Sequence, residues 1–154
     1  MASIADAARE LAEEFAFFSD WEERYAHVID LGRTLEPLAP EERNEENRVR
    51  GCASQVWLVT EPNLTDGTPD GALHFRGDSD AHIVRGLIAV LFRIFQDRTA
   101  AEILGLEPRE IFERLGLAQS LTPQRSNGFI AMIERIRREA ASRAGVGEAQ
   151  LGES

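Results

Sequence analysis

Residues 77–95 read GDSDAHIVRGLIAVLFRIF, and this stretch decides the fold. The apolar residues from 83 to 95 cover almost every side of a helix, which is typical of a helix buried all round. Asp and Ser are good helix N-caps, and negative charge suits the positive end of a helix dipole, so residues 77–80 are predicted to start this helix. Gly86 in its middle predicts a close approach of a neighbouring element, which we expect to be the sheet.

Two strands are predicted just before this central helix. Residues 55–60 are rich in β-branched and aromatic side chains. Residues 72–76 alternate apolar and polar side chains, so that Leu73 and Phe75 share one face. Turn-forming residues fill the connection at 61–71, which indicates an antiparallel hairpin with a long loop.

Amphipathic helices are predicted on both sides of this hairpin. Residues 4–18 repeat apolar side chains at helical spacing, and Trp21 and Tyr25 are expected to face the core from a second helix. Helices, a small antiparallel sheet and further helices indicate an α+β fold. We expect a single domain over residues 1–154, with a core at about 3–143 and a disordered tail at 144–154.

Composition narrows the function classes. Acidic residues number 27 against 17 basic ones, giving a formal net charge of −10, which disfavours nucleic-acid binding. Every basic residue is arginine, which excludes a lysine base or Schiff-base nucleophile. There is no apolar run of membrane-spanning length and the first helix is too acidic for a signal peptide, so we expect a cytoplasmic protein without membrane association.

Cys52 is the only cysteine in the chain. Val49 stands alone among polar residues before it, which predicts an exposed strand or loop, and Gly51 suits a turn. We therefore expect Cys52 near the tip of a loop. Arg48 and Arg50 are nearby cations that are expected to favour the reactive thiolate. The alternative is that Cys52 is a buried small hydrophobe, as free cysteines commonly are.

Metal and phosphate sites are not indicated. His27, His74 and His82 show no paired spacing, and no Gly-rich phosphate loop occurs. Asp78 and Asp80 are the right residue types for a metal, but helix capping explains them better. We predict no metal site.

Four blocks of sequence, taken in order, resemble the SufE family of sulfur-acceptor proteins. They are WEERY at 21–25 with Leu31-Gly32, RGCASQVW at 50–57, GDSDA at 77–81 with IVRGLIAV at 83–90, and LTPQRSNG at 121–128. Four ordered blocks are far more specific than one short motif. The resemblance implies an α+β fold of the SufE/IscU type, with a small antiparallel sheet packed against several helices.

The resemblance also implies a function. Cys52 matches the cysteine that accepts sulfur from the persulfide of a cysteine desulfurase and passes it to an iron–sulfur cluster scaffold. Pyridoxal phosphate would belong to the desulfurase, and this chain would bind no cofactor. Whether the chain counts as an enzyme stays open, because it acts together with the desulfurase.

Seven further residues in these blocks are candidates for loop or partner-binding roles. They are Arg50, Gly51, Ser54, Gln55, Asp78, Asp80 and Arg125. Gly51, Ser54 and Gln55 are expected to let the loop swing between a shielded and an extended pose, whereas capping and packing explain Asp78, Asp80 and Arg125 nearly as well.

Two rival functions remain. The chain could be a regulatory module of the desulfurase with an inert Cys52. An iron–sulfur scaffold is the less favoured rival, because clusters are held by several thiolates and one chain offers a single one. The sequence leaves open which desulfurase, which branch of the family and which downstream acceptor apply. It also leaves open a monomer or a homodimer, and the resting pose of Cys52.

Overall fold

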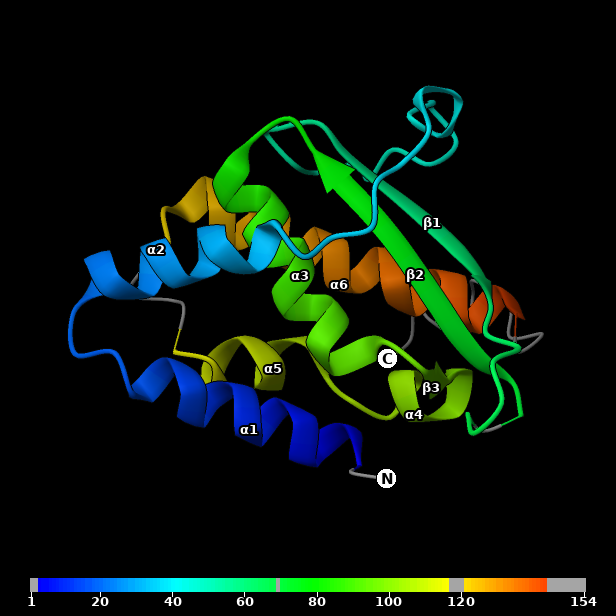
Figure 1. The fold of residues 1–154 in the computed structure, drawn as a ribbon, viewed down its shortest axis with the longest axis horizontal. Helices are drawn as coiled ribbons and strands as arrows, with labels where there is room; N and C mark the ends of the chain where they lie inside the picture. The colour runs from blue at the N-terminus through cyan, green and yellow to red at the C-terminus, as the bar shows by residue number, and fades with distance from the viewer. Residues whose placement is uncertain (1–2, 69, 117–120, 144–154) are drawn as a thin grey trace.

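The structure is a computed structural model that describes residues 3–68, 70–116 and 121–143. These residues confirm the α+β fold (Figure 1). In chain order the elements are α1 (Ile4–Ala16), α2 (Trp21–Gly32), η1 (Pro40–Glu42), β1 (Val56–Pro62), β2 (Ala72–Ser79), α3 (His82–Phe95), β3 (Arg98–Thr99), α4 (Ala100–Leu104), α5 (Pro108–Arg114) and α6 (Pro123–Arg143). The predicted tail at 144–154 lies outside the described residues.

The predicted hairpin is confirmed and carries a third, short strand that the sequence did not indicate. The strand order is β1-β2-β3, and both pairings are antiparallel. Leu58 pairs with Gly77 and Thr60 with Phe75, which places these residues on the inner face. A Cβ at Gly77 would lie 3.2 Å from the Ile88 side chain, so α3 packs directly on this face.

The start of the central helix differs from the prediction. Asp78 and Ser79 continue β2, and α3 begins at His82 after Ala81, which has no side-chain cap. The physical reason is the ladder with β1, where Val56 pairs with Ser79 and keeps this backbone extended. Asp78 and Asp80 are therefore not helix caps.

The central helix is buried as predicted, but Gly86 serves a different contact. A Cβ on Gly86 would lie 2.0 Å from the carbonyl oxygen of Val28 in α2. A Cβ on Gly32 would lie 2.7 Å from the backbone nitrogen of Gly86. The two helices therefore touch backbone to backbone where α2 crosses α3 (Figure 1). The close neighbour of Gly86 is a helix rather than the sheet.

Trp21 corrects the predicted orientation of α2. Its side chain is 54% exposed, and its ring packs edge-on against Tyr25 at 5.0 Å between centroids. Tyr25 is only half-buried, and the buried residues of α2 are Val28 and Gly32. The aromatic pair therefore lies at the margin of the core. The reason is that α2 packs on α3 near its C-terminal end, where Gly32 meets Gly86, so that its last turns are buried and its first turn is not.

Three helix starts are capped by residues that lie close to them in the sequence. Ser3 and Thr99 each form a reciprocal capping box, with Asp6 and Glu102 respectively. The Asp20 side chain accepts from the backbone N–H at the start of α2. These signals act within three residues, so tertiary packing does not override them.

Substituting Gly86 tests the backbone contact. We expect Gly86→Ala to lower the free energy of unfolding by about 3 kcal/mol, because the added methyl group must push α2 away from α3. Urea denaturation measures this. Gly105→Ala is the control, since a Cβ there would meet nothing closer than 3.4 Å, and it should change stability by less than about 1 kcal/mol. Equal effects of the two variants would contradict the close crossing.

Candidate functional site

The loop that carries Cys52 is held at both ends by backbone hydrogen bonds. Val49 N–H donates to the carbonyl of Val56 at 2.8 Å, and Leu58 N–H donates to Asn47 at 2.8 Å. Gly51 turns the chain with φ of 92°, a conformation that glycine adopts without strain. Val49 is only 3% exposed, so the predicted exposed position is wrong. Its backbone continues the sheet beside β1, which turns its side chain into the core.

Cys52 lies against a part of α6 built from small residues. Its Sγ donates to the carbonyl oxygen of Gly128 across 3.5 Å. A Cβ added at Gly128 would lie 3.6 Å from the same sulfur, and one added at Gly51 would lie 3.1 Å from the Cβ of Ala131. The small residues at positions 128 and 131 therefore let the loop lie close on the helix. They form part of the site that sequence reasoning did not assign, although their spacing on one helix face was a usable signal.

A cavity of about 240 Å³ opens beside the thiol. Loop residues, the first turns of α6 and one side of α3 enclose it. The lining residues are Cys52, Ala53, Ser54, Val84, Leu87, Thr122, Gln124, Arg125, Gly128, Phe129 and Met132. The thiol is therefore half-buried beside a cavity that the loop, α3 and α6 line, whereas Gly51 and Ala53 on either side of it are exposed.

Burial changes the chemistry expected for Cys52. Removal from water raises the pKa of the Cys52 thiol above its ordinary value, because the charged form loses solvation. The predicted activation by neighbouring arginines is wrong. Arg50 pairs with Glu45 at 2.9 Å and Arg48 approaches Glu45 at 3.6 Å, so both cations are engaged by a carboxylate.

Asp80 ties the far end of the loop to the start of α3. Its carboxylate accepts from the backbone N–H of Gln55 at 3.1 Å, and its own N–H donates to the carbonyl of Gln55 at 3.3 Å. Ser54, next to Gln55, lines the cavity. The two hydrogen bonds form a latch, which is the role that replaces the predicted helix cap.

Asp78 serves the scaffold beneath the loop. Its side chain is about 10% exposed and lies between Arg43, at 2.7 Å, and Arg85, at 2.9 Å. It also accepts from the N–H of Ser79 at 2.8 Å. Arg43 in turn covers the ring of Trp57 at 5.7 Å. Asp78 thus joins β2, α3 and the segment that precedes the loop, and it does not line the cavity.

Arg125, like Ser54, is a predicted loop or partner-binding residue that lines the cavity. It lies in the first turn of α6, which Thr122 caps by accepting from the N–H of Arg125 at 3.3 Å. Its guanidinium carbon stands 5.9 Å from the centre of the Tyr25 ring, a cation–π contact between α6 and α2. Arg125 and Cys52 therefore share one cavity, whereas Arg50 stays exposed beside Glu45.

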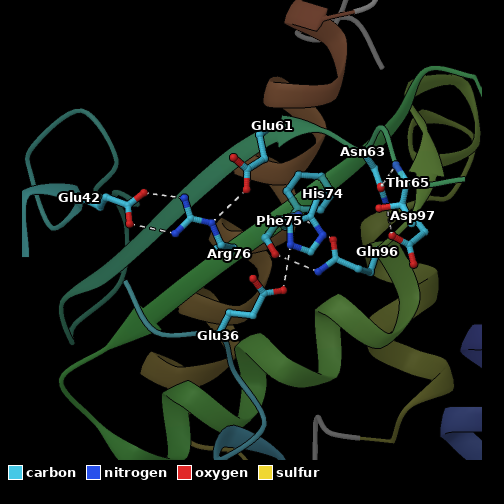
Figure 2. Close-up of polar contacts among 10 residues, drawn as sticks. All are labelled: Glu36, Glu42, Glu61, Asn63, Thr65, His74, Phe75, Arg76, Gln96 and Asp97. Carbon is cyan, nitrogen blue, oxygen red and sulfur yellow. Dashed lines mark hydrogen bonds and ion pairs between the residues drawn. The ribbon is translucent and has the colours of Figure 1, made fainter. Parts of the chain in front are cut away.

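A strap, residues 36–47, crosses the outer face of the hairpin and leads into the Cys52 loop. Figure 2 shows its two main attachments to β2: Glu36 to His74, at 2.9 Å, and Glu42 to Arg76. The Arg76 guanidinium donates to both oxygens of Glu42, at 2.9 and 2.6 Å. These hydrogen bonds lower the pKa of Glu42 to about 2. The carboxylate therefore remains charged through the neutral range, and the base of the loop stays attached.

The strap meets α6 as well. Arg135 donates to the carbonyl of Arg48 at 2.9 Å and to that of Glu46 at 2.7 Å. Its Nε lies 3.0 Å from Glu139. One end of the loop is thus fixed by a side chain of the same helix that carries Gly128.

The described residues, 3–68, 70–116 and 121–143, hold neither a metal-binding cluster nor a membrane-spanning helix. Within these ranges no three His, Cys, Asp or Glu side chains gather closely enough to hold a metal ion. Over the same part of the chain, no helix combines the length and apolar character needed to cross a bilayer.

The raised thiol pKa predicts slow reaction of the folded protein with electrophiles. We expect the rate of Cys52 alkylation by iodoacetamide in the folded protein to keep rising with pH beyond the pH at which the rate for the urea-unfolded chain levels off. Arg50→Gln should leave the profile unchanged. If the midpoint of the pH profile were lower for the folded protein than for the unfolded chain, folding would lower the thiol pKa, and the hypothesis of an activated thiolate would be supported instead.

A thiol pKa that is raised by folding also affects the free energy of unfolding. The contribution of Cys52 to stability is complete below the pKa of the unfolded chain and is lost as the pH rises through the pKa of the folded protein.

Opening the latch should expose the thiol. We expect Asp80→Ala to speed alkylation of Cys52 by about fivefold at fixed pH, because the loop loses a hydrogen bond of about 1 kcal/mol. Asp66→Ala, an exposed aspartate in the connection between β1 and β2, is the matched control and should show the wild-type rate. The latch has no role if the two variants react equally fast.

The chain is similar over most of its length to proteins of one family. Residues 9–140 match the model of the SufE family, described as an Fe–S metabolism associated domain. An uncharacterized SufE-like protein of Rhizobium etli is 50% identical over 136 residues, covering 88% of this chain and 90% of that protein. An uncharacterized SufE-like protein of Rhizobium meliloti is 46% identical over 134 residues, covering 87% and 94%.

The fold also occurs among solved structures. One example is the solution structure of a hypothetical protein from Thermus thermophilus, with a TM-score of 0.71 and 18% sequence identity. The match covers 90% of this chain and 96% of that one, so the whole architecture is common to both. The match of the family model over most of the chain, together with relatives close to half identical, establishes that this chain belongs to the SufE family, whose domain is associated with Fe–S metabolism.

Proposed function

We propose that this protein accepts a sulfur atom on Cys52 from the persulfide of a pyridoxal-phosphate cysteine desulfurase. It then passes that sulfur to an iron–sulfur cluster scaffold. The observation that carries the proposal is the position of Cys52, with its sulfur beside a cavity and its loop held by a few hydrogen bonds. Membership of a family associated with Fe–S metabolism supports it.

The proposed transfer balances without an added oxidant or reductant. The Cys52 thiolate attacks the outer sulfur of the donor persulfide, a new sulfur–sulfur bond forms, and the old one breaks. The donor cysteine leaves as a thiolate with the electron pair. The pyridoxal phosphate that generates the donor persulfide belongs to the desulfurase, and this chain is proposed to bind no cofactor of its own.

The half-buried thiol suggests how transfer would be regulated. Because burial raises the pKa of Cys52, the resting protein holds less of the reactive thiolate than a solvent-exposed cysteine would. Docking of the desulfurase is proposed to open the latch at Asp80 and bring Cys52 into water, where thiolate forms more readily. After transfer, return to the cavity would shield the persulfide from oxidation.

A regulatory module with an inert Cys52 is the second candidate. The same burial favours it, because a thiol with a raised pKa is a poor nucleophile at rest. Such a module would stimulate the desulfurase through surface contacts alone, so its effect would not depend on the sulfur atom.

Mass spectrometry separates the two candidates. After incubation with a cysteine desulfurase and free cysteine, we expect a mass gain of one sulfur atom on Cys52 that a reducing agent removes. Cys52→Ser should neither gain this mass nor stimulate desulfurase turnover. Cys52→Ser is also expected to fold, because serine replaces sulfur by a smaller atom at a half-buried position. Full stimulation by Cys52→Ser would establish the regulatory module instead.

A further inference from the structure

The cavity beside Cys52 is larger than one carried sulfur atom requires. Its volume of about 240 Å³ is many times the roughly 10–15 Å³ that one water molecule requires in the same measure. A terminal persulfide sulfur needs about the space of one water molecule. A loaded Cys52 would therefore leave room for a second small molecule within reach of the same sulfur.

The lining of this cavity favours an anion. Arg125 is the one charged residue among the described lining residues, and within the described chain it forms no ion pair with a carboxylate. Tyr25 holds its guanidinium by the cation–π contact at 5.9 Å, which leaves the guanidinium edges available to a ligand. Thr122 and Gln124 bring the start of the 21-residue helix α6 to the same wall, and a helix start attracts negative charge.

Four other lining residues are apolar, namely Val84, Leu87, Phe129 and Met132. A molecule that suits this mixed lining carries an anionic group and a soft, weakly hydrated group. The thiol lies on the loop side, next to Gly128.

We propose that this cavity binds a small thiol bearing a carboxylate, and that this thiol removes the carried sulfur from Cys52. The inference rests on the proposed function, because it requires a Cys52 persulfide. The carboxylate pairs with Arg125 and the start of α6, while the ligand's thiolate faces the outer sulfur of Cys52. That thiolate attacks the outer sulfur, the bond between the two persulfide sulfurs breaks, and Cys52 leaves as a thiolate with the electron pair. The product is the persulfide of the small thiol, and the step needs no oxidant or reductant.

Three thiols of similar size provide the test. The protein is loaded chemically with inorganic polysulfide, and its loss of sulfur is followed by mass spectrometry with 3-mercaptopropionate, 2-mercaptoethanol or cysteamine. We expect the rate with 3-mercaptopropionate to saturate as its concentration rises. The ratio of this rate to the rate with the neutral 2-mercaptoethanol should be about fivefold higher for the wild type than for Arg125→Gln. Comparing each thiol between two proteins cancels its intrinsic reactivity. Cysteamine, which is cationic, should gain nothing from Arg125.

Matched variants and a competitor keep the test decisive. Arg138→Gln, an exposed arginine farther along α6, should retain the wild-type preference, and Arg125→Lys should retain most of it because the charge remains. Propionate, which has the carboxylate but no thiol, should slow the reaction with 3-mercaptopropionate and leave that with 2-mercaptoethanol unchanged. An equal preference in wild type and Arg125→Gln overturns the proposal, as does failure of propionate to compete.

Chemical loading separates this inference from the proposed function. If polysulfide loads Cys52 but a desulfurase does not, the proposed function fails while the cavity can still be tested. If the desulfurase loads Cys52 and no carboxylate preference appears, the proposed function stands and the small-thiol site is rejected.

Discussion

The backbone contact between Gly32 and Gly86 is the constraint on which the rest of the structure depends. It lets α2 lie directly on α3, closer than any side chain at either position would permit. That crossing places Tyr25 near the start of α6, where it holds Arg125. The opposite side of α3 packs on the hairpin at Gly77, and Val84 and Leu87 form one wall of the cavity. One close helix crossing therefore positions the sheet that carries the Cys52 loop and the arginine that faces the thiol's cavity.

The proposed sulfur transfer places two opposing demands on Cys52. The sulfur must become a thiolate to react, yet burial raises the pKa of the thiol and so disfavours the thiolate. The loop that carries Cys52 is firmly fixed at its two ends and only weakly held at its tip. Arg135 and the β-type hydrogen bonds anchor the ends, whereas a weak sulfur hydrogen bond to Gly128 is the polar contact of the thiol itself. Local opening of such a loop costs little compared with unfolding the domain.

Charge on the outer face of the hairpin has a structural use. The strap at residues 36–47 is a mostly polar connection in which Leu38 is the buried hydrophobic side chain. Figure 2 shows two of its attachments, the polar contact of Glu36 with His74 and the ion pair of Glu42 with Arg76. A third attachment is the ion pair between Arg43 and Asp78. The Arg76 side chain is only about a fifth exposed and donates to the carboxylates of Glu42 and Glu61. Its ion pairs are therefore stronger than a typical pair on the protein surface. The many acidic residues of the first third of the chain are partly explained by this strap.

The sequence by itself determined the elements whose signals are local. The periodicity of α1 and α6, the caps at Ser3 and Thr99, the alternation of Leu73 and Phe75 and the single cysteine could all be read directly, because they depend on residues a few positions apart. Only the tertiary structure decided the roles of Asp78 and Asp80, since their partners Arg43 and Gln55 lie 35 and 25 residues away. It also turned Trp21 outward, Val49 inward and Gly86 toward a helix. Above all it made the thiol less acidic rather than more, because the desolvation that sets its pKa comes from distant parts of the chain, while the neighbouring arginines are engaged elsewhere.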